Sequence, residues 1–187
     1  MPKLMQKDGA TAFRKLFFYD KEKRNEAQNR LIYFLKNNKS RRVSFEAARE
    51  LSKILCEELT DLEIGVDEAV IVCVPRSRAS AARYGFDQSQ MICKELSSLC
   101  NIAFVKALKR RRGGKPQKFL TAGERRKNIQ NLLYPSKECA YAVKDKTVVL
   151  VDDVVTTGAS MSACIHILKS FGAKQVVCIA LSSDIKT

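Results

Sequence analysis

The sequence predicts an α/β fold in which helices cover both faces of a mainly parallel central sheet. Short aliphatic runs alternate along the 187 residues with longer polar or amphipathic segments, as expected when strands alternate with helices. The clearest run, residues 148–151, contains no polar residue, which is typical of a strand buried on both faces. The length suits one domain with its own core, so we expect residues 1–187 to form a single domain.

The N-terminal region, residues 1–65, is expected to be helical and to pack on the sheet. Residues 21–35 are polar and end in a group of apolar side chains. Residues 44–59 place apolar side chains three and four positions apart, which indicates a helix with one apolar face.

The rest of the chain is expected to alternate between strands and helices. Pro75 ends the first strand, residues 121–124 have the pattern of a helix capping box, and Gly172 ends the last helix. Residues 109–117 are highly charged and contain two glycines, which predicts a mobile basic loop able to act as a lid. The expected strands are 69–74, 102–108, 132–134, 147–152 and 175–181, and the expected helices are 88–99, 121–130 and 159–171.

The chain carries a formal net charge of +14, which is large for its length. Positive residues cluster at 41–42, 106–118 and 125–127. Such clusters favour attraction to a polyanion or to a highly phosphorylated ligand. The alternative is a solvated basic surface without a partner.

The seven cysteines are expected to be reduced and to pack as small apolar residues. They form no Cys-x-x-Cys pair, and with a single histidine their spacing does not fit a zinc site. His166 is expected on a helix, at its surface or packed, rather than in catalysis. No apolar run approaches the roughly 20 residues that cross a bilayer, and the N-terminus lacks the apolar core of a secretory signal. A cytoplasmic protein without a membrane span is expected.

The segment 148–160 carries the strongest functional signal. Two acids, Asp152 and Asp153, follow the aliphatic run, and a turn with hydroxyls and a glycine then opens a helix. Acids at the carboxyl edge of a parallel strand lie where open α/β sheets bind ligands. The turn offers backbone N–H groups at a helix N-terminus, which suits a phosphate. The segment therefore predicts a ribose-phosphate site; the alternative is an ordinary strand–turn–helix with Asp153 near the N-cap.

This pattern resembles the signature for phosphoribosyl pyrophosphate (PRPP) in type I phosphoribosyltransferases. The resemblance implies that Asp152 and Asp153 are catalytic and hold the ribose hydroxyls. It also implies that the residues after them hold the ribose and its 5′-phosphate. These are Val154, Val155, Thr156, Thr157, Gly158, Ala159 and Ser160.

A second turn leaves the first predicted strand at the same sheet edge. It contains Pro75, Arg76, Ser77 and Arg78. Two arginines beside a serine are suited to the pyrophosphate of PRPP, and this is the role we expect. The alternative is a plain strand-ending turn with solvated arginines.

Two further elements resemble the ComF-type competence proteins, a phosphoribosyltransferase-like family, and the resemblance covers about residues 15–184. The elements are residues 83–88 and 117–128. Many members carry an N-terminal four-cysteine zinc module, and this chain has none. Asp87 stands where asparagine is usual, and an acid there would repel a phosphate if it faced the pocket. The resemblance implies loop or ligand contacts at Arg83, Gln88, Gln117, Arg125 and Asn128.

Two main functions follow as expectations, beside a third possibility, a nucleotide-responsive regulator on the same fold. The first is a phosphoribosyltransferase-like protein that binds PRPP with Mg²⁺, or a related nucleotide, and transfers the phosphoribosyl group to a nitrogenous acceptor in competence and DNA uptake. The second is a non-catalytic competence protein that binds single-stranded DNA or a partner and retains the ribose-phosphate pocket. Mg²⁺ is expected to arrive with PRPP, and no residue is assigned as its ligand. The acceptor is not indicated, and a dimer is compatible with either function.

Overall fold

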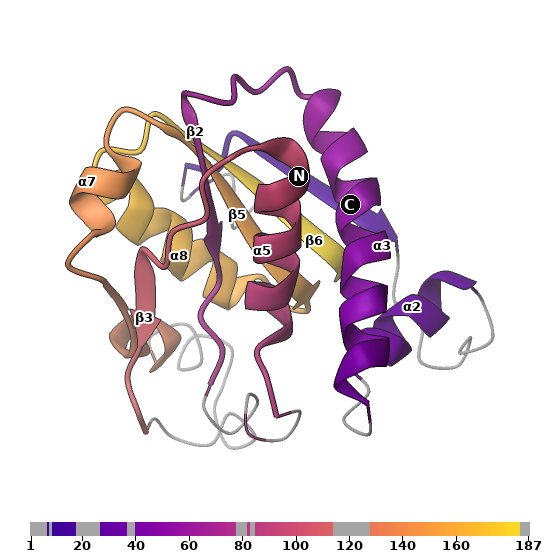
Figure 1. Cartoon of the computed structure of the whole chain (residues 1–187). Helices are drawn as coiled ribbons and strands as arrows, with labels where there is room; N and C mark the ends of the chain where they lie inside the picture. The colour runs from indigo at the N-terminus through magenta and orange to yellow at the C-terminus, as the bar shows by residue number, and fades with distance from the viewer. Residues whose placement is uncertain are drawn as a thin grey trace.

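The computed structural model describes residues 9–17, 27–36, 40–77, 85–113 and 128–183, together with Lys7 and Ala82. Its centre is a four-stranded sheet in the order β1-β6-β5-β2, and every strand pair in it is parallel (Figure 1). This confirms the expected fold class. The strands are β1 (Ala12–Phe17), β2 (Ala69–Cys73), β5 (Thr147–Val155) and β6 (Gln175–Ser183).

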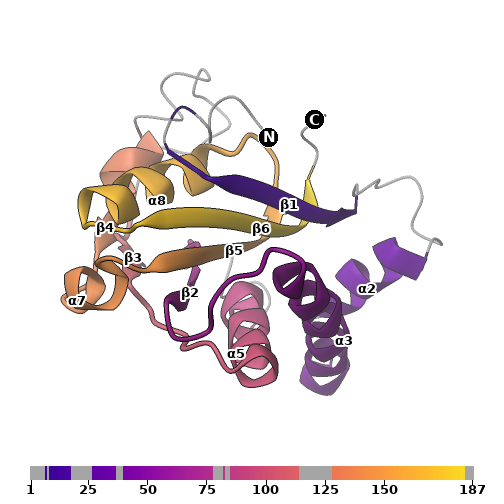
Figure 2. The ribbon, with the colours of Figure 1, turned by 90° about the horizontal axis from the view of Figure 1, so that it is seen from above.

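Helices cover both faces of this sheet, as Figure 2 shows from above. Residues of β5 alternate between two separate cores: Val148 and Leu150 pack on the side of α8, whereas Val149 and Val151 pack on the side of α3 and α5. Both faces of the strand are therefore buried, which explains why it needs an unbroken aliphatic run. One side carries α2 (Ala27–Leu35), α3 (Arg41–Thr60) and α5 (Gln88–Cys100), and the other carries α7 (Cys139–Val143) and α8 (Ala159–Ser170).

The first strand of the structure lies where a helix was expected, so the prediction of a wholly helical N-terminal region is wrong. Strand β1 pairs with β6, and Phe13 lies opposite Cys178. Phe13 is buried, whereas its neighbour Arg14 is exposed. A short segment with this composition becomes a strand because β6 offers it a free edge, which is a tertiary effect.

The structure also contradicts the bounds expected for the strand 102–108. Phe104 makes one isolated parallel bridge to Ile71, whose N–H donates to the Ala103 carbonyl at 2.8 Å. The chain then leaves the sheet and forms β3 (Leu108–Arg110), which pairs antiparallel with β4 (Leu133–Pro135). The start of the expected loop 109–117 therefore belongs to a hairpin strand, and residues 114–117 lie outside the described residues.

The other expected helices and strands lie within a few residues of their expected bounds. The expected helix 121–130 is described only from residue 128, and residues 128–132 are helical. His166 is exposed on α8, as expected. None of the helices that the structure describes is long and apolar enough to cross a membrane.

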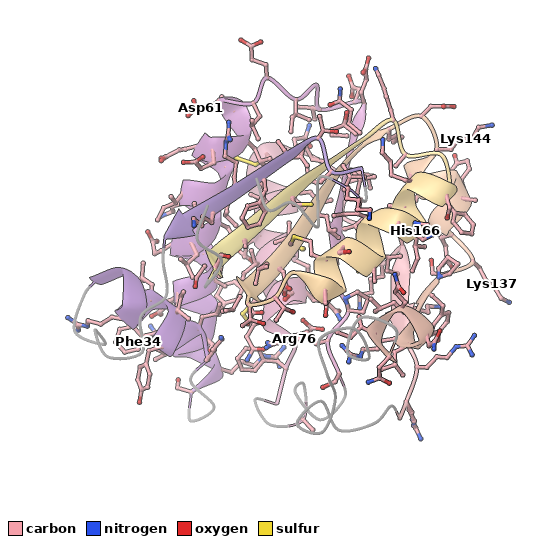
Figure 3. The ribbon with its side chains drawn as sticks, turned by 180° about the vertical axis from the view of Figure 1, so that it is seen from behind. Phe34, Asp61, Arg76, Lys137, Lys144 and His166 are labelled. Carbon is pink, nitrogen blue, oxygen red and sulfur yellow. A yellow bond between two sulfur atoms is a disulfide. The ribbon has the colours of Figure 1, made fainter. Side chains whose placement is uncertain are left out.

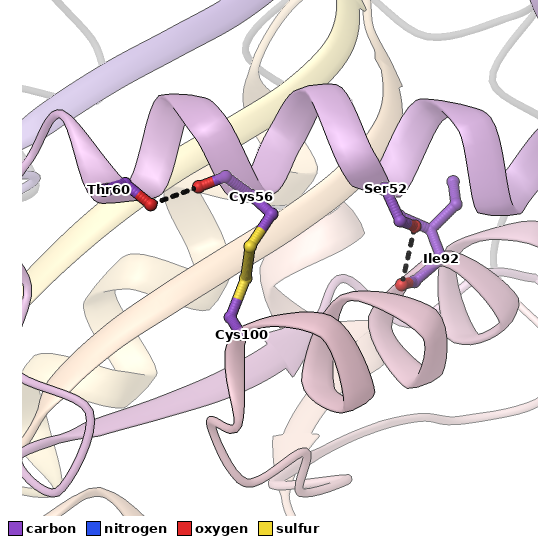
Figure 4. Close-up of a disulfide and its surroundings, with 5 residues drawn as sticks. All are labelled: Ser52, Cys56, Thr60, Ile92 and Cys100. Atoms are coloured by element: carbon purple, nitrogen blue, oxygen red, sulfur yellow. Dashed lines mark hydrogen bonds between the residues drawn. A yellow bond between two sulfur atoms is a disulfide. The ribbon is translucent and has the colours of Figure 1, made fainter.

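Two cysteines contradict the expectation of a fully reduced chain. Cys56 on α3 and Cys100 at the end of α5 form a disulfide, at a sequence separation of 44 (Figure 4). Nearby, Ser52 Oγ on α3 donates a hydrogen bond to the Ile92 carbonyl of α5 at 3.3 Å. The pairing follows from the packing of the two helices side by side. Five cysteines, at positions 73, 93, 139, 164 and 178, are free and buried.

Candidate functional site

The two acids lie at the carboxyl end of β5, and strand alternation separates their side chains. The N–H of Asp153 donates to Asp152 Oδ1 at 2.9 Å. Asp153 continues the row of Val149 and Val151 and so faces α2 and α5, whereas Asp152 continues the row of Leu150 and faces α8. The two carboxylates therefore lie on opposite faces of the sheet at this edge.

Asp153 is a buried carboxylate held by two cations. The residue is 3% exposed. Its Oδ2 lies 3.2 Å from Arg76 Nη2 and 3.5 Å from Lys36 Nζ. A buried charge is tolerated only when it is paired, and these two cations provide the pairing.

Asp152 is half-buried and has a different electrostatic environment. Burial raises the pKa of its carboxyl well above the usual range, and the charge of Asp153 raises it further. Arg76 opposes both effects. This carboxyl is therefore prepared to exchange a proton or to meet a cation when a ligand arrives.

The turn after β5 forms a small hollow at the start of α8. Gly158 caps the helix with a φ of 74°, a left-handed conformation that favours glycine. Thr157 Oγ1 accepts from the Ala159 N–H at 3.5 Å, and Thr156 is exposed beside it. Because Gly158 is the cap, the alternative in which Asp153 lies near the N-cap is wrong. The hollow measures about 50 Å³ and is lined by Asp152 and by Val154, Val155, Thr156, Thr157, Gly158, Ala159, Ser160 and Met161.

The second turn, residues 74–77, lies at the same edge of the sheet. Figure 3 shows Arg76 at the opposite end of the molecule from Lys144, which precedes β5, and from Asp61. Arg76 Nη1 donates to the Oε1 of Gln88, the fully buried first residue of α5. The structure thus brings Arg76 and Gln88 together with the acid pair. Pro75 and Ser77 are half-buried in the turn.

Asp87 has a structural role that its position in the sequence did not reveal. It is the N-cap of α5: its Oδ1 accepts from the Gln90 N–H at 3.1 Å, and its Oδ2 accepts from Gln90 Nε2 at 3.0 Å. Both carboxylate oxygens are engaged within the first turn of the helix. An acid at this position is therefore explained by capping.

A larger hollow of about 280 Å³ joins the second turn to the β3–β4 hairpin. We call it the basic hollow, because Arg76, Lys106, Lys109 and Arg110 line it together with Tyr134. Asp87 also lines it, so the acid that was expected to be unfavourable for a phosphate does face this hollow. Burial lowers the pKa of the Arg110 guanidinium from its usual value. The charge clustering at 106–118 signalled these cations, but not that β3 would set them beside Arg76.

The remaining predicted site residues are Arg78, Arg83, Gln117, Arg125 and Asn128. Arg78, Arg83, Gln117 and Arg125 lie outside the described residues. Asn128 is half-buried at the start of the helix 128–132 and lines neither hollow. Conversely, Lys36 was not predicted, because nothing in its local sequence indicates contact with an acid far along the chain.

The described residues contain no group of three His, Cys, Asp or Glu side chains suited to a metal ion. Mg²⁺ commonly binds through one or two carboxylates together with the phosphates of a substrate. Asp152, half-buried beside the small hollow, fits that kind of shared coordination.

Known proteins resemble the chain in sequence and in fold. Among curated relatives, the DNA utilization protein YhgH of Escherichia coli O157:H7 is 34% identical over 107 residues, which are 57% of this chain and 45% of the relative. Competence protein F of Haemophilus influenzae is 28% identical over 136 residues, covering 68% of this chain and 57% of the relative. The chain thus spans about half the length of the curated relatives it matches.

Among solved structures, a hypoxanthine phosphoribosyltransferase from Staphylococcus aureus has the same fold. Its TM-score is 0.51 at 15% identity, over 76% of this chain and 70% of that one. Residues 40–186 match the model of the phosphoribosyl transferase domain. The chain therefore belongs to the phosphoribosyl transferase domain family, and the names of its relatives confirm its resemblance to the ComF-type competence proteins.

Proposed function

We propose that the protein binds PRPP with Mg²⁺ at the carboxyl edge of the sheet and transfers the phosphoribosyl group to a nitrogenous acceptor, in a role linked to competence. The observation that carries this proposal is the meeting of three parts at one edge. These are the acid pair of β5, the turn that opens α8, and Arg76, whose Nη2 lies 3.2 Å from Asp153 Oδ2. The competence and DNA utilization names of the relatives support the biological setting.

Each part of the edge matches one part of PRPP. The turn 156–160 offers N–H groups and hydroxyls at the start of α8 to the 5′-phosphate. Asp152 and Asp153 accept hydrogen bonds from the ribose hydroxyls. The basic hollow, with Arg76, Lys106, Lys109 and Arg110, receives the pyrophosphate.

The proposed chemistry is substitution at the anomeric carbon of the ribose. The bond to the pyrophosphate oxygen breaks, and a nitrogen of the acceptor forms the new bond with the same carbon. The transition state resembles an oxocarbenium ion, as in glycoside cleavage. The two carboxylates tolerate its positive charge, and the cations of the basic hollow stabilise the departing pyrophosphate. Mg²⁺, when bound, adds to the neutralisation of the pyrophosphate.

Thermal stabilisation by PRPP with Mg²⁺ tests the binding site. A ligand that binds only the folded state at 100 times its Kd adds about 2.7 kcal/mol of stability. We expect wild type to be stabilised and the double variant Asp152→Asn/Asp153→Asn to lose the effect. Asp67→Asn, an exposed acid before β2, is the matched control and should behave as wild type. A wild-type protein that PRPP leaves unstabilised contradicts the proposal.

Pyrophosphate release in the presence of a panel of nucleobases and amines tests turnover separately. Release that depends on one acceptor, and that the acid-pair variant loses, supports a transferase. Binding of PRPP without release from any acceptor favours a non-catalytic pocket.

A second candidate function, binding of single-stranded DNA, is favoured by another hollow. It measures about 290 Å³ and lies between the start of α3 and α5, where Phe45 and Phe86 are accompanied by the cations Arg41 and Lys94. Bases stack on aromatic rings, and cations contact the phosphates that link them. Asp87 and Gln90 line both this hollow and the basic hollow, so the two are contiguous.

Fluorescence anisotropy with a labelled oligonucleotide tests this second candidate. Affinity should fall steeply as salt rises, because phosphate contacts release counterions. Phe45→Ala should weaken binding, whereas Tyr141→Ala, which removes a ring that is 94% exposed on α7, should not. Equal effects of the two substitutions, or affinity that salt leaves unchanged, would argue against a DNA site in this hollow.

A further inference from the structure

We propose that Lys36 is a positioning residue of the phosphoribosyl pocket: it holds Asp153 when Arg76 turns to the pyrophosphate of a bound ligand. Lys36 lies before the stretch that matches the phosphoribosyl transferase domain, residues 40–186. This inference rests on the proposed function, and it adds the N-terminal helix α2 to the site.

The place of Lys36 is fixed by a packed helix. The Lys36 N–H donates to the Ile32 carbonyl at 3.1 Å and so continues the last turn of α2. Ile32 and Leu35 are fully buried in the core shared with α3. Ser44 Oγ on α3 donates to the Phe34 carbonyl at 3.1 Å and ties the end of α2 to its neighbour. Core packing therefore delivers the Lys36 ammonium to Asp153.

The ion pair between Lys36 and Asp153 differs from an ordinary surface pair. The Asp153 side chain is 5% exposed and the Lys36 side chain is 23% exposed, so water screens the pair weakly. Lys53 on α3 provides the contrast: it meets Glu50 at 2.7 Å, but about half of each side chain is exposed. Exposed pairs of that kind contribute little to stability or to binding.

Arg76 is engaged both by Asp153 and by the basic hollow. The Arg76 guanidinium holds Asp153 through Nη2 and Gln88 through Nη1, and it also lines the basic hollow. A guanidinium suits the oxygens of a pyrophosphate, so a bound ligand competes with Asp153 for it. Lys36 does not line the basic hollow. When Arg76 turns to the ligand, Lys36 remains to compensate the buried charge of Asp153.

This exchange predicts a dependence on the ligand that a purely structural role would not produce. PRPP carries the pyrophosphate that draws Arg76 away, whereas ribose 5-phosphate does not. Removal of the Lys36 charge should therefore weaken the binding of PRPP more than the binding of ribose 5-phosphate. Lys36→Met removes the charge and keeps the apolar stem, Lys36→Arg keeps the charge, and Lys53→Met is the matched control.

Calorimetric titration with PRPP and Mg²⁺, and NMR titration with ribose 5-phosphate, make the comparison in the full chain. For Lys36→Met we expect a Kd for PRPP that is about tenfold higher, equivalent to about 1.4 kcal/mol. We expect less than about a threefold change for ribose 5-phosphate, equivalent to less than about 0.7 kcal/mol. Lys36→Arg should restore most of the PRPP affinity, and Lys53→Met should match wild type.

The outcomes separate this inference from the proposed function. If wild type and Lys36→Met bind PRPP equally well, the role of Lys36 is overturned and the proposed function stands. Equal weakening of both ligands also overturns it, because Lys36 would then act only through the fold. A wild type that does not bind PRPP overturns the proposed function and this inference together. Lys36→Gln, judged by the same comparison, replaces Lys36→Met if circular dichroism shows that the methionine variant does not fold.

Discussion

Replacement of Asp153 by asparagine should destabilise the ligand-free protein. The change keeps the shape of the side chain and removes the charge that Arg76 and Lys36 both contact. Loss of one partner from a buried ion pair commonly costs about 3–5 kcal/mol. The two cations keep 16% and 23% of their side chains exposed, and the amide oxygen can still accept a hydrogen bond, so part of this cost is relieved. We expect the free energy of unfolding to fall by about 2 kcal/mol, which is less than the loss for a fully buried pair.

Urea denaturation of Asp153→Asn and wild type at neutral pH measures this difference. For a protein of this size, about 2 kcal/mol should lower the melting temperature by about 4–8 °C. Asp67→Asn, an exposed acid, provides the control and should stay within about 0.5 kcal/mol of wild type. An Asp153→Asn variant as stable as wild type would refute the reasoning. The double variant with Arg76→Met should lose less stability than the sum of the two single losses, since the two substitutions remove one interaction.

Three further outcomes follow from the structure. The carboxyl of Asp152 has a raised pKa in the folded state. The free energy of unfolding should therefore decline as the pH rises from the ordinary pKa of this carboxyl, 3.8, through the raised pKa. Urea denaturation across pH should show this slope in wild type, and a slope that persists in Asp152→Asn would contradict the assignment. Gly158→Ala places a Cβ at a φ of 74° and should cost about 1 kcal/mol in thermal unfolding, whereas Gly65→Ala, with its nearest neighbouring atom 4.0 Å away, should be tolerated. Cys56→Ser should lower stability by about 2–4 kcal/mol without reductant, and the difference should disappear with reductant; an equal difference under both conditions would contradict a disulfide to Cys100.

The sequence predicted those parts of the fold and site that are local in the chain. The aliphatic run 148–151 identified a buried strand, because only a strand covered on both faces needs four apolar residues in succession. The acids after it, and a glycine before a helix, marked this edge as the candidate ligand site, because strand, turn and helix follow one another directly. Asp152, Asp153 and Gly158 therefore lie where they were expected.

The parts that were missed depend on contacts between distant segments. Strand β1 exists because β6 offers it an edge, and its pairing of Phe13 with Cys178 spans most of the chain. Lys36 belongs to the site because α2 packs on α3, a relation that its own neighbours in sequence do not encode. The sequence showed the charge of Asp87, which does line the basic hollow, but not the two hydrogen bonds with Gln90 that engage its carboxylate.

The opposite orientation of the two acids has a consequence for the mechanics of the molecule. Asp152 is attached to the layer that contains α8, and Asp153 reaches through Lys36 to the layer that contains α2. A small molecule that touches both carboxylates therefore bridges two layers that the sheet otherwise keeps apart. Occupancy of this edge should slow amide hydrogen exchange in α8 and in α2 together, although none of the described side chains of one helix lies in the other's core.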